Sequence, residues 1–196
     1  MREYGPDIGQ FRLEEVCRRI QKLTSAMMRF WKDAHGWAPF EAAGLLSNSM
    51  LDWQKSLASC LDLWLSASTH GELILAWANL GSLVEGQLKL FLSVWYNNYK
   101  SDAEAVKKKG KLQDPDSLML EPLRQFFVKR IWAKGKDWNP WVKHVQEKRN
   151  AIHAFQARDI GTFEMWREDV RNYLAFLRDM NSRLPYPDEV YIPREN

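Results

Sequence analysis

The sequence predicts an all-α protein: a single helical bundle of about five or six helices that spans residues 1–196. Apolar residues recur at spacings of three and four through most of the chain, and no run alternates as a strand would. The chain of 196 residues, 45% of them hydrophobic, is long enough for a sizeable core and short enough for one domain. Its 13% aromatic content and its balance of 28 basic against 25 acidic residues exclude an intrinsically disordered protein.

The N-terminal part, residues 1–66, is predicted to hold two helical regions. The first runs from about Gln10 to Asp33 and ends at the Gly- and Pro-containing segment 35–39, which disfavours a helix interior. The second runs from about Pro39 to Ser66. We place Trp53 on its apolar stripe and expect that ring in the core.

The third helix, from about Glu72 to Asn98, opens the second part of the bundle, residues 70–184. Gly81 and Gly86 interrupt its regular apolar stripe. Because Gly in a helix costs about 1 kcal/mol relative to Ala, close packing by a neighbouring element is the expected reason for both. Glu85 is an acid at the edge of the stripe, and we expect it to be solvated or bonded to a partner.

Residues 101–116 form the clearest segment outside the predicted core, with four lysines between positions 107 and 111. We expect a mobile, solvated loop, with a phosphate-contacting arm as the alternative. A fourth helix is predicted over about 117–133. A fifth begins with Asn139 as N-cap and Pro140 in the first turn, and runs to about Phe155.

The sixth helix is predicted to begin at Thr162, a good N-cap, and to stop before Pro185. Residues 185–196 are predicted to form an extended tail.

Other features favour a soluble, cytoplasmic protein. Cys17 and Cys60 lack CxxC spacing, so we expect two reduced thiols and neither a disulfide framework nor a cysteine zinc site. The N-terminus has no apolar signal-peptide region, and the most apolar stretch, residues 73–96, is interrupted by polar and charged side chains. No phosphate-binding loop, HExxH, GxSxG or metal-ligand spacing is present, so we predict no cofactor and no metal.

One short motif, Arg149-Asn150-Ala151-Ile152-His153 near the end of the fifth helix, carries groups suited to chemistry. At 100° per residue, Arg149 lies about 40° from Val145 and therefore within the apolar sector, with His153 at its edge. Because a buried guanidinium without a partner is very costly, an anion should meet Arg149. That anion could be a carboxylate, helix carbonyl groups, a second subunit or a ligand phosphate.

These residues resemble the motif of the HEPN superfamily (higher eukaryotes and prokaryotes nucleotide-binding). The family motif is an Arg, four to six residues and then a His, often with a polar residue directly after the Arg. It often has an aromatic residue two positions after the His. Here Arg149, Asn150, His153 and Phe155 fill these places, with a shorter gap of three residues and with Phe where the toxin subgroup often has Tyr.

The resemblance implies a metal-independent endoribonuclease that works as a homodimer, in which the RNA 2′-hydroxyl attacks the adjacent phosphate. Arg149 would stabilise the phosphate charge, His153 would transfer protons and Asn150 would assist. We assign Lys148, Lys143 and Trp141 as substrate-binding candidates. Eight basic against three acidic residues in the segment 121–150 place positive charge around the motif. The resemblance also implies an antitoxin or phage-defence partner.

Two other functions stay open: a non-catalytic helical module that binds a nucleotide, RNA or protein, and a purely structural subunit. The first would hold its ligand in the same groove, and in a domain that cleaves nothing Arg149 and His153 could be a structural pair, bonded to helix ends or to Glu85. We expect His144 to be an exposed helix residue, and His35 and His70 to be polar turn residues. Trp132, Trp138 and Trp141 are predicted to serve the core or a dimer contact rather than base stacking.

Overall fold

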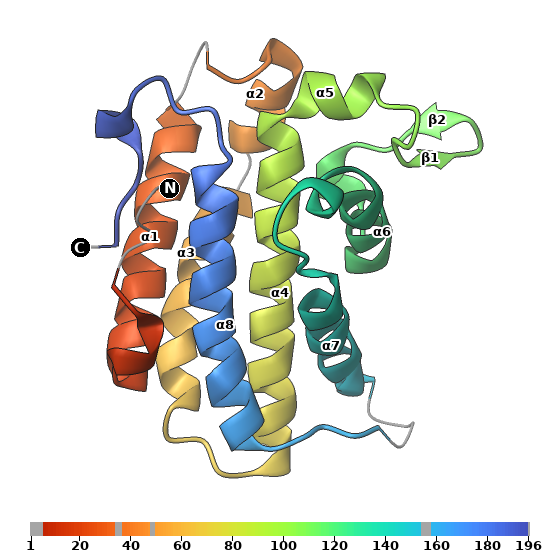
Figure 1. The fold of residues 1–196 in the computed structure, drawn as a ribbon. Coiled ribbons are helices and arrows are strands. Elements are labelled where there is room, and N and C mark those ends of the chain that lie inside the picture. The colour runs from red at the N-terminus through yellow and green to blue at the C-terminus, as the bar shows by residue number, and fades with distance from the viewer. Residues whose placement is uncertain (1–5, 34–36, 48–49, 154–157, 196) are drawn as a thin grey trace.

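A computed structural model describes residues 6–33, 37–47, 50–153 and 158–195. It confirms the predicted all-α bundle, to which a single short β-hairpin is added within these residues (Figure 1). The α-helices are α1 (Leu13–Asp33), α2 (Phe40–Ser47), α3 (Met50–Ser59), α4 (His70–Val94), α5 (Tyr96–Ser101), α6 (Leu120–Arg130), α7 (Asn139–Arg149) and α8 (Phe163–Ser182). The strands are β1 (Lys107–Lys108) and β2 (Lys111–Leu112). Short 3₁₀ turns are η1 (Ile8–Gln10), η2 (Cys60–Trp64), η3 (Pro115–Ser117), η4 (Trp132–Lys134), η5 (Asn150–Ile152) and η6 (Glu189–Tyr191).

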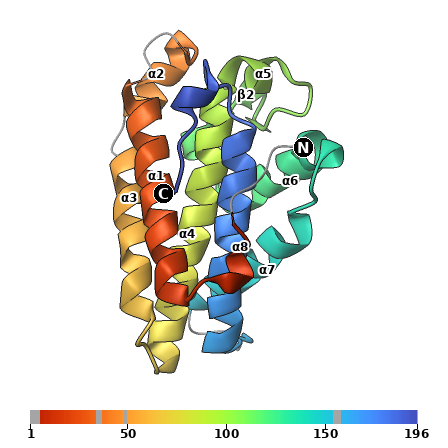
Figure 2. The ribbon, with the colours of Figure 1, turned by 60° about the vertical axis from the view of Figure 1, so that its left-hand side comes forward.

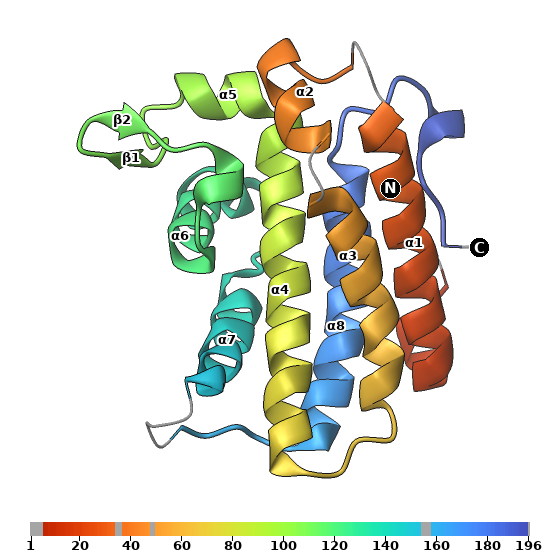
Figure 3. The ribbon, with the colours of Figure 1, turned by 180° about the vertical axis from the view of Figure 1, so that it is seen from behind.

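Four helices, α1, α3, α4 and α8, close into a ring in which each helix contacts two others (Figure 2). α7 packs on the side of α4 that faces away from α1, and α6 packs beside both α4 and α7 (Figure 3). Because α4 touches α3, α8 and α7, most of its surface is buried. This explains why its sequence is apolar on nearly every side.

Threonine side chains cap the N-termini of α4 and α8, and the cap at Thr162 is the one predicted from the sequence. Thr69 and Glu72 form a reciprocal capping box at the start of α4, and the Thr162 side chain accepts a hydrogen bond from the Met165 amide at the start of α8. The expected Asn139 N-cap of α7 is wrong, because Trp138 occupies the cap position and the Asn139 side chain accepts from Arg124 instead.

The core is built largely from aromatic rings, as the composition predicts. Trp31, Trp77 and Trp166 are fully buried, and Trp132 and Trp138 are also buried. Trp53 is a correction: its side chain is 64% exposed, because α3 turns that position away from both α1 and α4.

The second helical region consists of α2, α3 and the turn η2, which together cover residues 40–47 and 50–64. Cys17 and Cys60 carry free thiols, and burial raises the pKa of Cys17 to about 12. The C-terminal tail is non-helical apart from the turn η6. Within the described part of the chain, no helix is both long and apolar enough to cross a membrane.

Candidate functional site

The contact between α4 and α7 places Arg149 at the centre of the candidate site. Val142 and Val145 of α7 are buried, and the aliphatic stem of Arg149 lies directly on Gly81 of α4. A Cβ atom at position 81 would lie 2.5 Å from the Cδ atom of Arg149 and 2.8 Å from its Cβ atom. The expectation that a neighbour packs closely on Gly81 is thus confirmed, and the neighbour is the motif arginine itself.

The guanidinium of Arg149 meets a carboxylate. Its Nη1 atom lies 2.5 Å from Oε2 of Glu85, whose Oε1 atom lies 2.9 Å from Nζ of Lys89. The side chains of Glu85 and Lys89 are each 15% exposed, and that of Arg149 is 29% exposed. The triad Arg149–Glu85–Lys89 therefore joins two cations to one carboxylate, and it keeps a net positive charge with one edge open to solvent.

Glu85 has the partner that the sequence predicts for an acid at the edge of an apolar stripe. It is also one of the partners that the sequence allows for Arg149 in a non-catalytic protein. The ion pair alone therefore fits both functions, because the same contact can neutralise an arginine or hold it ready for a ligand.

The chain after Arg149 does not continue as the predicted α-helix. Asn150 opens the 3₁₀ turn η5, and its carbonyl oxygen accepts a 3.2 Å hydrogen bond from the His153 amide. His153 ends the turn with φ −84° and ψ 65°, and its side chain is exposed. A 3₁₀ turn steps about 120° per residue rather than 100°, and Ile152 in this turn is 46% exposed. Phe155 lies outside the described residues.

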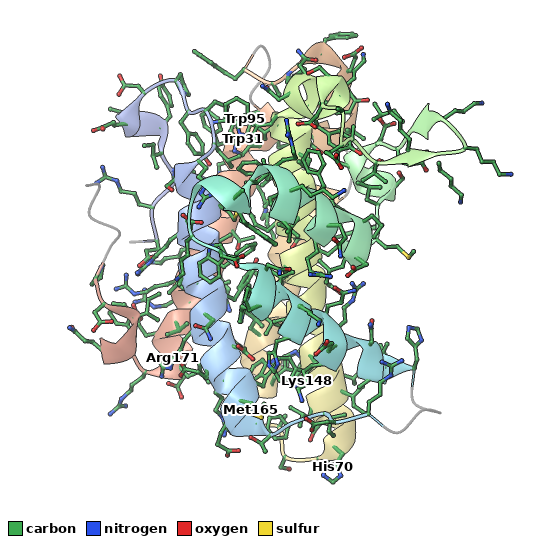
Figure 4. The ribbon with its side chains drawn as sticks, turned by 45° about the vertical axis from the view of Figure 1, so that its right-hand side comes forward. Trp31, His70, Trp95, Lys148, Met165 and Arg171 are labelled. Atoms are coloured by element: carbon green, nitrogen blue, oxygen red, sulfur yellow. The ribbon has the colours of Figure 1, made fainter. Side chains whose placement is uncertain are left out.

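The three substrate-binding candidates make other contacts. Nζ of Lys148 is buried and lies 2.7 Å from Oδ2 of Asp159, which ties α7 to the segment leading into α8 (Figure 4). Lys143 is exposed and lies 3.8 Å from Glu147. Nε1 of Trp141 donates a 2.8 Å hydrogen bond to Asp169 of α8. These contacts point toward solvent, α8 and the segment before α8, not toward Arg149.

Two carboxylates around this region have lowered pKa values, and a neighbouring cation is the main cause in each case. The hydrogen bond from Lys148 lowers the pKa of Asp159, with a further contribution from the Gly161 amide. On α6, the Arg124 guanidinium holds the pKa of Glu121 at about 2. Both carboxylates are therefore ionised at neutral pH, and they offset part of the basic charge that the sequence places between residues 121 and 150.

A second pair of polar groups lies on the opposite side of α7. Nε2 of His144 is 2.9 Å from Oδ2 of Asp169, a buried carboxylate that also accepts from Trp141 and Asn172. The prediction that His144 is a plain exposed residue is wrong, because α8 covers that face and leaves the side chain only 32% exposed. The spacing of Trp141, His144 and Lys148, all with polar tips on one face, is a signal that would have indicated a polar partner.

Two adjoining cavities lie away from the motif: one of about 580 Å³ between α4, α5 and α6, and one of about 750 Å³ between the end of α6, the segment 131–138 and α8. Arg130, Ile131 and Arg183 border both of them, whereas Arg149, Asn150 and His153 border neither. Among the described residues, no three His, Cys, Asp or Glu side chains are grouped as a metal site would require.

Comparison with family models, with curated proteins and with solved structures found no match for this chain.

Proposed function

We propose that this protein is a metal-independent endoribonuclease of HEPN type, with Arg149 and His153 as its reactive pair. The observation that supports the proposal is the triad Arg149–Glu85–Lys89, which is partly exposed, carries net positive charge and lies within four residues of the exposed His153. Gly81 accommodates the stem of Arg149 and Glu85 accepts a hydrogen bond from its guanidinium, so little reorganisation is needed when a phosphate binds.

The chemistry follows from these groups. The 2′-hydroxyl oxygen of RNA forms a bond to the adjacent phosphorus, and the bond from phosphorus to the 5′-oxygen breaks. His153 accepts the proton of the 2′-hydroxyl, and an acid returns a proton to the leaving 5′-oxygen. In a homodimer with facing motifs, the second copy of His153 supplies that acid. Arg149 donates to the phosphate oxygens while their charge grows, and Asn150 positions the motif backbone.

Cleavage of structured RNA in EDTA tests this proposal. Wild type should release fragments with 2′,3′-cyclic phosphate and 5′-hydroxyl ends. Arg149→Ala and His153→Ala should each slow cleavage by about 10²-fold or more. Arg29→Ala and His70→Ala alter exposed residues of the same types on α1 and α4, and they should cleave at the wild-type rate. Intact RNA with wild type, or equal cleavage by all variants, would overturn the proposal.

The homodimer has its own test in the mass of the protein in solution, which should be near twice that of one chain. The resemblance further proposes a cytoplasmic toxin with an antitoxin or phage-defence partner. Induced expression in bacteria should then stop growth, and Arg149→Ala should relieve the arrest. A strictly monomeric protein would remove the facing motifs on which the mechanism depends.

A non-catalytic binding module is the second candidate, and the bond between Arg149 and Glu85 favours it. A guanidinium that already donates to a carboxylate has fewer donors left for a phosphate. This candidate predicts that wild type binds RNA without cutting it, and that Glu85→Gln, which frees the guanidinium, tightens the binding.

A further inference from the structure

The run of four lysines between positions 107 and 111 is not a loop but an ordered β-hairpin, and we propose that this hairpin binds the phosphate backbone of RNA. We use the name lysine hairpin for Lys107, Lys108, Lys109 and Lys111 together with Gly110. The inference takes the identity of the ligand, RNA, from the proposed function. It concerns a surface apart from Arg149 and His153.

The turn of the lysine hairpin is tightly specified. Lys108 pairs with Lys111, and the two-residue connection has positive φ at both positions, 50° at Lys109 and 77° at Gly110. This is the pattern of a type I′ turn, which suits the twist of a hairpin. Gly110 adopts that conformation without strain, whereas Lys109 is a residue for which it is disfavoured.

The base of the lysine hairpin is held by a buried tyrosine. The Tyr99 hydroxyl donates a 2.8 Å hydrogen bond to the Gln113 carbonyl oxygen and accepts one of 3.2 Å from the Val106 amide. The Gln113 amide in turn donates to the Val106 carbonyl oxygen at 2.9 Å. Both strands are therefore anchored to α5, and the hairpin projects from the helices as a defined arm (Figures 1 and 3).

Several carboxylates of the neighbouring segments are already engaged elsewhere. Glu41 pairs with Lys100, Glu104 with Lys129 and Asp102 with Arg130, at 2.6 to 2.7 Å. In the described part of the chain, no carboxylate lies within ion-pair distance of the four hairpin lysines, all of which are exposed. The arm thus presents four uncompensated positive charges on one short, rigid element.

This arrangement opposes local stability. Lys108 and Lys111 are directly opposite each other, where like charges repel, and Lys109 occupies a backbone region that favours Gly or Asn. Conflicts between local preference and structure concentrate at functional sites. A ligand that carries a row of negative charges would remove the repulsion, and a nucleic-acid backbone is such a ligand.

The composition of the arm favours a nucleic acid over a membrane. A surface that enters a lipid interface needs exposed apolar side chains, and Leu112, the one large apolar residue of the two strands, is half-buried. Lysine ammonium groups on flexible stems suit phosphate contacts that do not depend on sequence.

Binding to a single-stranded 2′-O-methyl RNA tests the inference apart from cleavage, because this RNA lacks the attacking hydroxyl. The variant K107Q/K108Q/K109Q/K111Q should bind at least about tenfold more weakly at 0.1 M salt. The slope of log K against log salt should fall by about 2 to 3, since each lost phosphate contact on a single strand removes about 0.7. The matched control changes the same number of exposed cations on α1, α3 and the residue before α1: R12Q/K22Q/R29Q/K55Q.

Three results would overturn the inference: no binding by wild type, equal weakening in both variants, or no weakening in either. A hairpin variant that keeps its affinity for RNA but loses binding to vesicles of anionic phosphatidylserine would assign the arm to a membrane instead. Unfolding curves of both variants verify that the fold is retained. If wild type binds the methylated RNA through the hairpin yet leaves ordinary RNA uncut, the ribonuclease proposal fails. The inference that the lysine hairpin binds RNA would then still hold.

Discussion

Gly81 allows α4 and α7 to approach each other closely, because even one added carbon atom at this position would overlap Arg149. The absence of a side chain at Gly81 leaves space for the Arg149 stem. Gly86 on the same helix leaves space for the Gln54 amide in the same way. Each glycine weakens α4 as an isolated helix, and each is offset by the contact it permits. Glu85 lies four residues after Gly81 on the same face of α4, where it meets the Arg149 guanidinium.

Gly81→Ala should lower the free energy of unfolding by about 1–3 kcal/mol, because the added Cβ atom would overlap the Arg149 stem. Gly44→Ala is the matched control, since an added Cβ atom at that exposed position of α2 meets nothing within 4 Å. It should instead stabilise the protein by about 0.5–1 kcal/mol through helix propensity. Urea unfolding measures both, and a stabilising Gly81→Ala would show that α7 moves freely away from α4.

Single residues also show where sequence reasoning reaches its limit. Arg149 needs an anion because it lies among apolar neighbours, so the sequence predicts that its partner is anionic but not which group it is. That the partner is Glu85, and that His144 pairs with Asp169, depends on which helices meet. Periodicity within one helix carries no information about which acid on another helix lies opposite.

At the scale of elements, the ends of helices decide what the candidate site looks like. α7 changes to the turn η5 at Asn150, which takes His153 off the helical path and exposes it. No Gly or Pro marks that change, so the apolar pattern alone predicted a longer helix. The lysine hairpin was missed for a related reason: strands of two residues are too short for alternation to be visible.

Tyr99→Phe should loosen the lysine hairpin while leaving the bundle folded, because it deletes the hydroxyl that bonds to Val106 and Gln113, the residues that flank the two strands. The expected loss of stability is about 1–3 kcal/mol, the cost of leaving buried polar groups unpaired. Tyr96→Phe is the control, since that hydroxyl donates to Asp114 outside the paired strands.

Amide hydrogen exchange gives the direct measurement. Exchange at Lys108 and Gln113 should quicken in the Tyr99 variant and change little in the Tyr96 variant. Equal exchange in wild type and both variants would mean that the turn alone maintains the hairpin.

At the scale of the whole molecule, side chains of α8 bond to both terminal segments of the described chain. Arg171 donates to the carbonyl oxygens of Ile8 and Phe11, and Arg178 donates to that of Pro6 (Figure 4 labels Arg171). Arg178 and Arg19 also hold the Glu195 carboxylate, with N···O distances of 2.8 and 2.9 Å. The two terminal segments are thus fastened to the α1–α8 side of the ring.

The Glu195 carboxylate makes this fastening dependent on pH. Burial alone would raise its pKa, but the bonds from Arg178 and Arg19 outweigh burial and lower the pKa below the ordinary value of about 4.3. A lowered folded pKa contributes stability that is present above the unfolded pKa and is lost as the pH falls through the folded pKa.

Glu195→Gln should therefore cost about 2 kcal/mol at pH 7 and progressively less as the pH falls below 4. Glu189→Gln, an exposed carboxyl in the same segment, serves as the control and should change little at any pH. Urea unfolding at pH 7, 4 and 3 measures the differences. A deficit in Glu195→Gln that stays constant with pH would contradict the ionic origin of the contact.

The sequence by itself determined the all-α class, the capped start of α8, the aromatic core and the close packing at Gly81. These features follow from local periodicity, capping chemistry and the intrinsic cost of glycine, all of which act within a few residues. Only the tertiary structure decided that Glu85 meets Arg149, that Asp169 meets His144 and that Tyr99 anchors the lysine hairpin. Each of these contacts joins residues from different elements, and the packing of those elements depends on the whole core rather than on any one segment.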